Sequence, residues 1–120
     1  MRIMTLLLSG LLFFSALDDA QLAYIQCLGA ESDAALRERV PADLFAQGAL
    51  QICEDETAAF RAAAMPMLTA QADGGGEAAE QRFATMDAAN RTRLIQSYAG
   101  KLRARRGVRS GDSVGDEVPQ

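Results

Sequence analysis

Two cysteines, Cys27 and Cys53, carry the most distinctive chemistry of this chain. A cysteine pair forms a disulfide in an oxidising compartment, whereas in a reducing one it supplies two thiols. The midpoint between the two, position 40, is followed by Pro41, so the pair falls level on the two arms of a predicted antiparallel helical hairpin. A disulfide here would close a loop of about 25 residues, which stabilises a fold by roughly 3 kcal/mol. The alternative is a pair of buried free thiols.

The remaining residue types offer little for catalysis. The sequence contains no histidine, which excludes a His-containing triad, a His-ligated haem and a His-ligated zinc site. Ser32, Thr57 and Ser97 therefore have no imidazole to activate them, and Lys101, the only lysine, stands among arginines. We predict that the protein is not an enzyme and takes no cofactor.

Two groups of side chains are candidate metal ligands. The carboxylates of Glu54–Glu56 are adjacent, but consecutive residues on a helix point about 100° apart and cannot converge on one ion. Met65 and Met67, with Met86 later in the chain, are thioethers of the kind that bind Cu(I). Methionines that close the end of a core explain them more simply. We predict no metal site, and an enzyme or metal carrier, resting only on the methionines and isolated acids, stays a third hypothesis.

The basic residues gather near the end of the chain. Residues 18–87 carry 13 acids and 4 bases, a net charge of −9, whereas residues 88–111 carry 7 bases and no acid. Either this basic segment neutralises the acidic half inside the fold, or it contacts an acidic protein or an anionic lipid surface. Nucleic acid is not an expected partner of an exported protein with Tyr98 alone for stacking. The candidate binding residues are Arg91, Arg93, Lys101, Arg103, Arg105, Arg106 and Arg109.

The N-terminus predicts export. Arg2 precedes an apolar run that ends at Leu17, and fifteen helical residues rise roughly 22 Å, short of a hydrocarbon core of about 30 Å. This pattern is typical of a secretory signal peptide over residues 1–16, cleaved after Ala16. The alternative is an uncleaved signal that tethers the chain. We predict a bacterial periplasmic or secreted protein, and not an integral multi-span membrane protein.

Apolar spacing predicts that the rest of the chain is all-α. We expect helices over about 18–31, 41–64 and 77–106, with the second helix ending before Pro66 and a connector over residues 65–76. The first two helices would form the hairpin stapled by the cysteines, and the third would pack beside it. Residues 17–106 would be one domain, and residues 107–120 a disordered tail.

These observations favour a small exported helical module that binds a partner protein or an envelope surface. The alternative is a peripheral membrane-surface module that uses the basic third helix. No characterised family is recognised from these residues.

Overall fold

The computed structural model describes the backbone of residues 2–117 and the side chains of residues 16–107. This described part is all-helical, which confirms the predicted fold class. It contains four helices where the sequence predicts three. They are α1 (Arg2–Glu38), α2 (Ala42–Gly48), α3 (Glu54–Gln71) and α4 (Gly75–Glu117).

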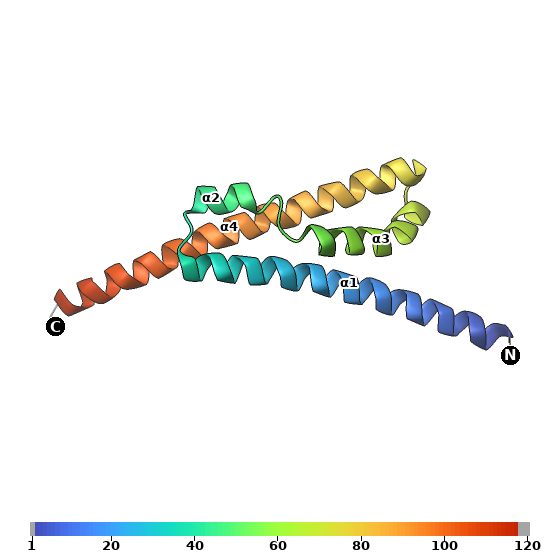
Figure 1. Cartoon of the computed structure of the whole chain (residues 1–120), viewed down its shortest axis with the longest axis horizontal. Coiled ribbons are helices and arrows are strands. Elements are labelled where there is room, and N and C mark those ends of the chain that lie inside the picture. The colour runs from blue at the N-terminus through green and yellow to red at the C-terminus, as the bar shows by residue number, and fades with distance from the viewer. Residues whose placement is uncertain (1, 118–120) are drawn as a thin grey trace.

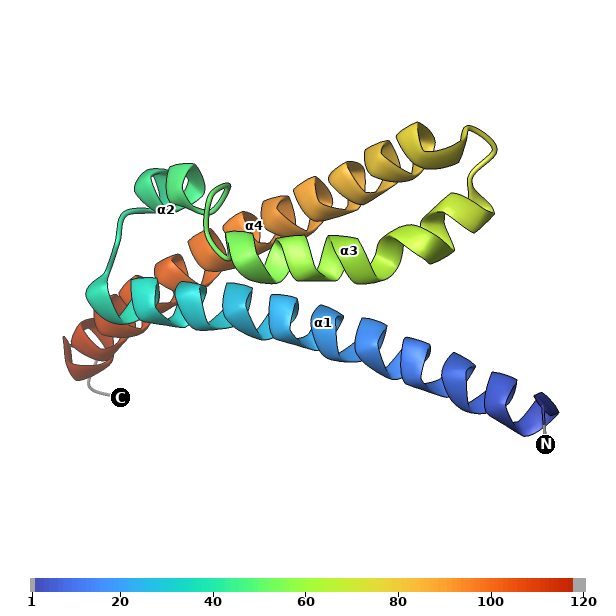
Figure 2. The ribbon, with the colours of Figure 1, turned by 45° about the vertical axis from the view of Figure 1, so that its right-hand side comes forward.

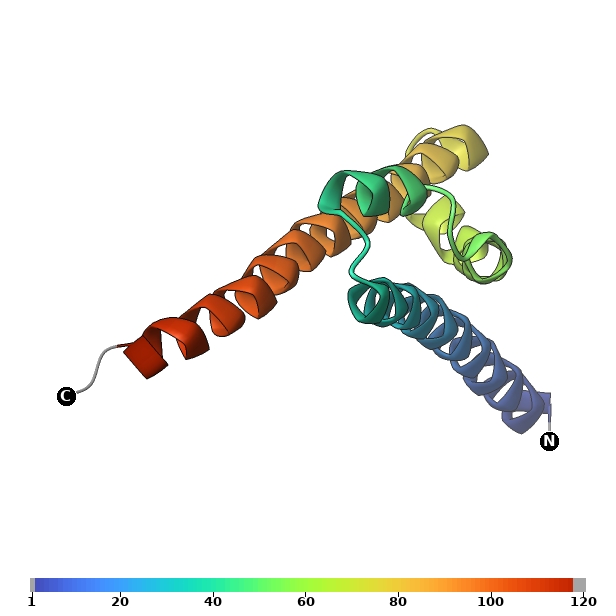
Figure 3. The same cartoon turned by 60° about the vertical axis from the view of Figure 1, so that its left-hand side comes forward.

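The two long helices, α1 and α4, diverge from a region in which they contact each other and α3. α3 packs against both α1 and α4, α1 also contacts α4 directly, and the short helix α2 packs on α4 (Figure 1). Figure 2 shows α3 lying between α1 and α4. Beyond this region the N-terminal part of α1 and the C-terminal part of α4 point away from each other (Figure 3), and the molecule is elongated, 76 × 32 × 23 Å.

Two small clusters of buried side chains hold these helices together. The first joins α1, α3 and α4, and its members are Leu17, Tyr24, Leu28, Phe60, Ala64 and Phe83. The second joins the end of α1 with α2 and the middle of α4, and its members are Leu36, Phe45, Ala49, Tyr98 and Leu102. Aromatic rings fill both, with Tyr24 against Phe60 in the first and Phe45 stacked on Tyr98 in the second.

α1 is longer than predicted because its buried stripe does not stop at residue 31. Leu28, Ser32 and Leu36 are all buried and follow each other at intervals of four residues, the spacing of one helix face. Gly29 sits inside the helix, where a glycine costs only about 1 kcal/mol. Packing of Leu36 in the second cluster therefore carries the helix through the predicted break to Glu38.

The predicted second helix, 41–64, is interrupted. α2 ends at Gly48, residues 49–53 are not helical, and Cys53 precedes α3 in a left-handed conformation with φ 61°. Because α2 and this loop separate α1 from α3, the predicted direct hairpin between the first two helices is not confirmed. Cys53 therefore lies at the start of a helix and not at its centre.

Pro66 does not end α3, which continues to Gln71. A proline inside a helix leaves the carbonyl four residues earlier without its N–H partner. Ala62 and Pro66 are both exposed, so water can bind that carbonyl, while Leu68 continues the packing on the first cluster. The connector shrinks to residues 72–74, and Gly75 begins α4 with φ 67°, a value that favours glycine.

Both ends of the chain differ from the prediction in extent. α4 continues to Glu117, past the predicted end at 106 and into the segment predicted to be a disordered tail; no proline interrupts the sequence before Pro119. Of the predicted signal segment, residues 2–16 form the first part of α1, and the side chains of residues 1–15 lie outside the described part. In the part that is described, no helix combines the length and apolar character needed to cross a membrane.

Candidate functional site

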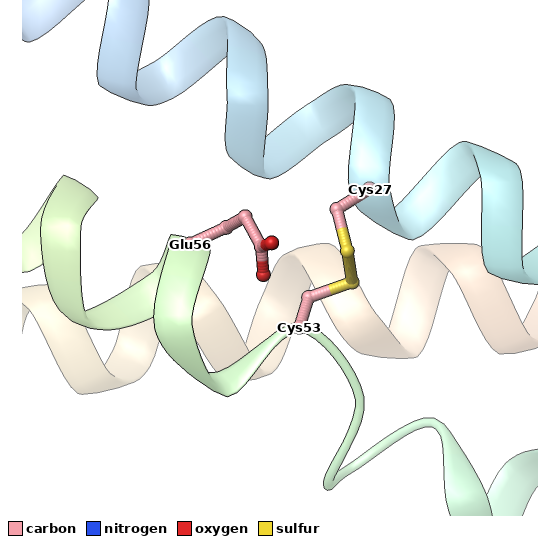
Figure 4. Close-up of side chains that lie close together, drawn as sticks. All are labelled: Cys27, Cys53 and Glu56. Carbon is pink, nitrogen blue, oxygen red and sulfur yellow. A yellow bond between two sulfur atoms is a disulfide. The ribbon is translucent and has the colours of Figure 1, made fainter.

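The two cysteines meet across α1 and the start of α3. Their Sγ atoms are at disulfide distance, 2.06 Å, and their Cα atoms are 6.0 Å apart, within the range that a disulfide requires. The cysteine pairing predicted from the sequence is therefore confirmed as a pair at disulfide distance. Figure 4 shows Glu56, from the first turn of α3, beside the two sulfur atoms.

Arg91 lies inside the molecule and not on the predicted basic surface. Its side chain is buried, and its Nη1 donates hydrogen bonds to the carbonyl oxygens of Ala49 (2.7 Å) and Ile52 (2.9 Å). Its Nη2 donates to Thr57 Oγ1 (2.8 Å), and its Nε forms an ion pair with Asp87 (2.9 Å). These contacts, which we call the Arg91 network, satisfy the carbonyls that the loop 49–53 takes out of helical hydrogen bonding. The assignment of Arg91 to a binding surface is therefore wrong.

Tyr24 joins the Arg91 network from α1. Its side chain is 1 % exposed, and its hydroxyl donates a hydrogen bond to Asp87 Oδ1. Burial, helped by this hydrogen bond to the Asp87 carboxylate, raises the pKa of the Tyr24 hydroxyl from 10.0 to about 12. The network therefore connects α1, the loop before α3, α3 itself and α4.

The free energy of unfolding is expected to fall as the pH rises from 10 to 12. The unfolded tyrosine loses its proton near pH 10, whereas the folded Tyr24 keeps it until about pH 12, so deprotonation favours the unfolded state in this window. A shift of this size corresponds to a loss on the order of 2 kcal/mol. Denaturant unfolding at pH 9 and near pH 12 tests this, and the Tyr24→Phe variant should lose less stability over the same interval. Equal losses in both proteins would contradict it.

The other predicted basic residues divide into two sets. Arg93, Lys101 and Arg103 are exposed along α4. Arg105 and Arg106 line a cleft between the end of α1 and α4. The side chain of Arg109 lies outside the described part of the chain. The structure therefore does not gather the seven predicted residues in one place.

The cleft has a volume of about 670 Å³ and is lined by Leu36, Arg37, Arg39, Leu102, Ala104, Arg105 and Arg106. Leu36 and Leu102 belong to the second core cluster, so the cleft has an apolar floor. The four arginines are exposed, and no acidic residue is among the seven that line it. We call it the four-arginine cleft.

Arg39 enters this cleft from a strained turn. The N–H groups of Arg39 and Val40 donate to the carbonyls of Leu36 and Ala35, which is the Schellman arrangement that ends a helix. The left-handed residue of that arrangement is usually glycine, yet Arg39 holds it with φ 56°. The hydroxyl of Tyr98 hydrogen-bonds to the carbonyls of Ala35 and Val40 on either side and so fixes the turn.

The ion pairs found among the described side chains leave out the four arginines of the cleft, although Asp33 and Glu38 lie within one helical turn of Arg37 on α1. The ion pairs among the described side chains are Arg61–Glu80 and Arg91–Asp87, and neither involves the cleft. The acidic first turn of α3 lies level with Arg91, because Thr57 contacts that residue. Arg105 is fourteen residues further along α4, about 21 Å at helical rise, beyond a Debye length of about 8 Å. Burial raises the pKa of the Tyr98 hydroxyl, and the positive charges of Arg105 and Arg106 partly oppose that rise.

The sequence alone did not predict the α1 side of the four-arginine cleft or the Tyr24 and Asp87 members of the Arg91 network. Arg37, Arg39 and Leu36 belong to the cleft from α1, which the sequence assigns to the acidic half. One usable signal was the position of Arg39, which directly precedes Val40 and Pro41. This is the place just past the end of a helix where glycine is common. Tyr24 and Asp87 are 63 residues apart and carry no local signal of their contact.

The chain was also compared with known proteins. No protein-family model, curated protein or solved structure matches it. Its function is therefore inferred from the cleft and the cysteine pair.

Proposed function

We propose that the protein is an exported, non-enzymatic helical module that binds an acidic segment of a partner protein in the four-arginine cleft. The observation that carries this proposal is the combination of four guanidinium groups with an apolar floor of Leu36 and Leu102. Export is supported by the apolar N-terminal run and by the cysteine pair at disulfide distance. Leu17, the first residue after the predicted cleavage point, is buried in the first core cluster, so the proposed mature chain would keep that cluster.

The energetics of the cleft favour a ligand that carries carboxylates. Like charges gathered in one concavity repel each other, and Arg39 adds a left-handed conformation that costs roughly 1–2 kcal/mol. An arginine binds a carboxylate through two parallel hydrogen bonds, which a lysine cannot reproduce. A ligand with several carboxylates would relieve the repulsion at all four positions.

The shape of the cleft favours a protein segment over a membrane surface. A concave site with an apolar floor accepts an apolar side chain between the guanidinium groups, as in hot spots of protein interfaces. An acidic amphipathic segment, with carboxylates on both sides of a leucine-like anchor, matches this arrangement. A flat anionic membrane would contact the exposed Arg93, Lys101 and Arg103 as readily as the cleft.

Removing two cleft charges should weaken binding of a synthetic peptide with alternating glutamates and leucines. The double substitution Arg105→Gln and Arg106→Gln should raise the dissociation constant at least about tenfold, which corresponds to about 1.4 kcal/mol. The matched control is the pair Arg93→Gln and Arg103→Gln, which removes the same charge from the same helix outside the cleft and should change binding by less than about twofold. Calorimetry at two salt concentrations measures both, and salt should weaken the wild-type complex.

Arg39→Gly separates binding from folding in the same experiment. Glycine accepts φ 56° without strain, so this variant should be as stable as the wild type or up to about 1 kcal/mol more stable. Its peptide binding should nevertheless weaken, because a guanidinium is gone. Equal losses for the cleft pair and the control pair would contradict the cleft as the site. Binding to phosphatidylglycerol vesicles that depends equally on both pairs, without peptide binding, would favour the membrane-surface alternative.

A further inference from the structure

The second group of chemically capable side chains surrounds the cysteine pair. Cys27 Sγ, Cys53 Sγ and a carboxylate oxygen of Glu56 all lie within 4.8 Å of one another. Cys27 comes from α1, Cys53 precedes α3, and Glu56 is in the first turn of α3 (Figure 4). All three are half-buried. Sequence reasoning treated Glu56 only with its acidic neighbours and did not combine it with the cysteines.

Glu56 is placed where it would normally cap the helix, but it does not do so. It stands three residues after Cys53, the position from which a glutamate reaches back to the N-cap backbone in a capping box. No side-chain hydrogen bond caps α3. Its carboxylate lies beside the sulfur atoms instead. The Glu56 carboxylate therefore makes no capping hydrogen bond, while its negative charge still suits the N-terminal turn of α3.

Two cysteine sulfurs and a carboxylate oxygen are donor types that bind zinc in proteins. We propose that reduction of the Cys27–Cys53 pair opens a binding site for Zn²⁺ formed by the two thiolates and the Glu56 carboxylate. Two thiolates beside a carboxylate would place three negative charges in a half-buried site, which is unfavourable unless protons or a cation offset them. Thiolate sulfur selects zinc over magnesium or calcium, and three protein ligands leave a fourth tetrahedral position for water.

Opening the site requires a two-electron reduction of the disulfide. A dithiol reductant supplies two electrons and two protons, its own sulfurs form a disulfide, and Cys27 and Cys53 become thiols. Zinc then displaces the two thiol protons. With zinc–sulfur bonds of about 2.3 Å at the tetrahedral angle, the sulfur atoms would be about 3.8 Å apart. Cα atoms 6.0 Å apart accommodate that separation by rotation of the two side chains. In the oxidised form the sulfurs are bonded to each other and the site is closed.

Zinc binding by the full chain tests the proposal, with Co²⁺ as a spectroscopic probe of thiolate ligation. After reduction by a phosphine without oxygen, the wild type should bind one equivalent of Zn²⁺, and the oxidised protein should bind none. Glu56→Gln should weaken binding at least about tenfold, the lower end of what an outer-shell change costs a metal site. The matched control is Asp55→Asn, an exposed acid of the same helical turn, which should bind as the wild type does. Cys27→Ser should abolish the thiolate-to-cobalt absorption.

A folding readout keeps the experiment decisive. Circular dichroism is recorded on the reduced proteins before and after zinc, because the chain loses a stabilising crosslink on reduction. If the reduced wild type is partly unfolded, zinc should restore its helical signal, and the signal of Glu56→Gln should recover only at higher zinc concentrations. Equal zinc affinities for wild type, Glu56→Gln and Asp55→Asn would overturn the proposal, as would equal binding by the oxidised protein.

Discussion

Replacing Arg91 with methionine is expected to lower the free energy of unfolding by about 3–5 kcal/mol. Methionine keeps much of the length and the apolar stem, but it removes every donor of the guanidinium group. The carbonyls of Ala49 and Ile52 then lose their partner in a buried site, and each unsatisfied carbonyl costs about 1–3 kcal/mol. Asp87 loses its ion pair at the same time. Denaturant unfolding monitored by circular dichroism measures the change.

Arg93→Met is the control for this effect. It removes the same charge from the same helix two residues away, where the side chain is exposed, and a surface substitution of this kind usually changes stability by less than about 0.5 kcal/mol. If Arg91→Met cost no more than Arg93→Met, the Arg91 network would not hold the loop 49–53. Tyr24→Phe should be intermediate, because it removes a single hydrogen bond to Asp87.

Arg91 and Arg93 also show where inference from the sequence stops. The two residues have the same chemistry and lie in the same uninterrupted basic segment. Periodicity does distinguish the faces of a helix, but an arginine on an otherwise apolar face gives no sign of which carbonyls it will meet. Those carbonyls belong to the loop 49–53, which exists because the predicted helix 41–64 is interrupted. The burial of Arg91 and the interruption of that helix therefore depend on each other.

The features that were predicted correctly either have local causes in the sequence or can be predicted without knowledge of the three-dimensional fold. Helical periodicity and the lack of strand-like alternation are properties of neighbouring residues, so the all-α class followed from them. With two cysteines there is one possible intramolecular pair, so the contact of Cys27 and Cys53 did not require knowledge of the fold. Helix ends were predicted less well, because Leu36 and Leu68 extend α1 and α3 through tertiary packing. The cleft needs the C-terminal end of α1 to meet residues 102–106 of α4, and no local pattern indicates that contact.

Breaking the cysteine pair is expected to cost the fold about 3 kcal/mol of unfolding free energy. The two residues are 26 apart in sequence, and a crosslink of this span stabilises a fold mainly by restricting the unfolded chain. A loss of this size is a large part of the 5–15 kcal/mol that typically stabilises a small domain. Thermal and denaturant unfolding with and without reductant, in the presence of a chelator to exclude zinc, measures it. Cys27→Ala with Cys53→Ala should reproduce the reduced value.

The cysteine pair and the Arg91 network should also be energetically coupled. Cys53 ends the loop 49–53 whose carbonyls Arg91 binds, and its own carbonyl accepts a hydrogen bond from Thr57, which in turn contacts Arg91. Residues that share such a network are typically non-additive by about 0.5–3 kcal/mol. Reduction should therefore destabilise the Arg91→Met variant less than the wild type. Without the Arg91 hydrogen bonds, the loop no longer keeps the arrangement that the crosslink supports. An equal effect of reduction in both proteins would mean that the crosslink acts on the unfolded chain alone and that the loop is held by Arg91 independently of it.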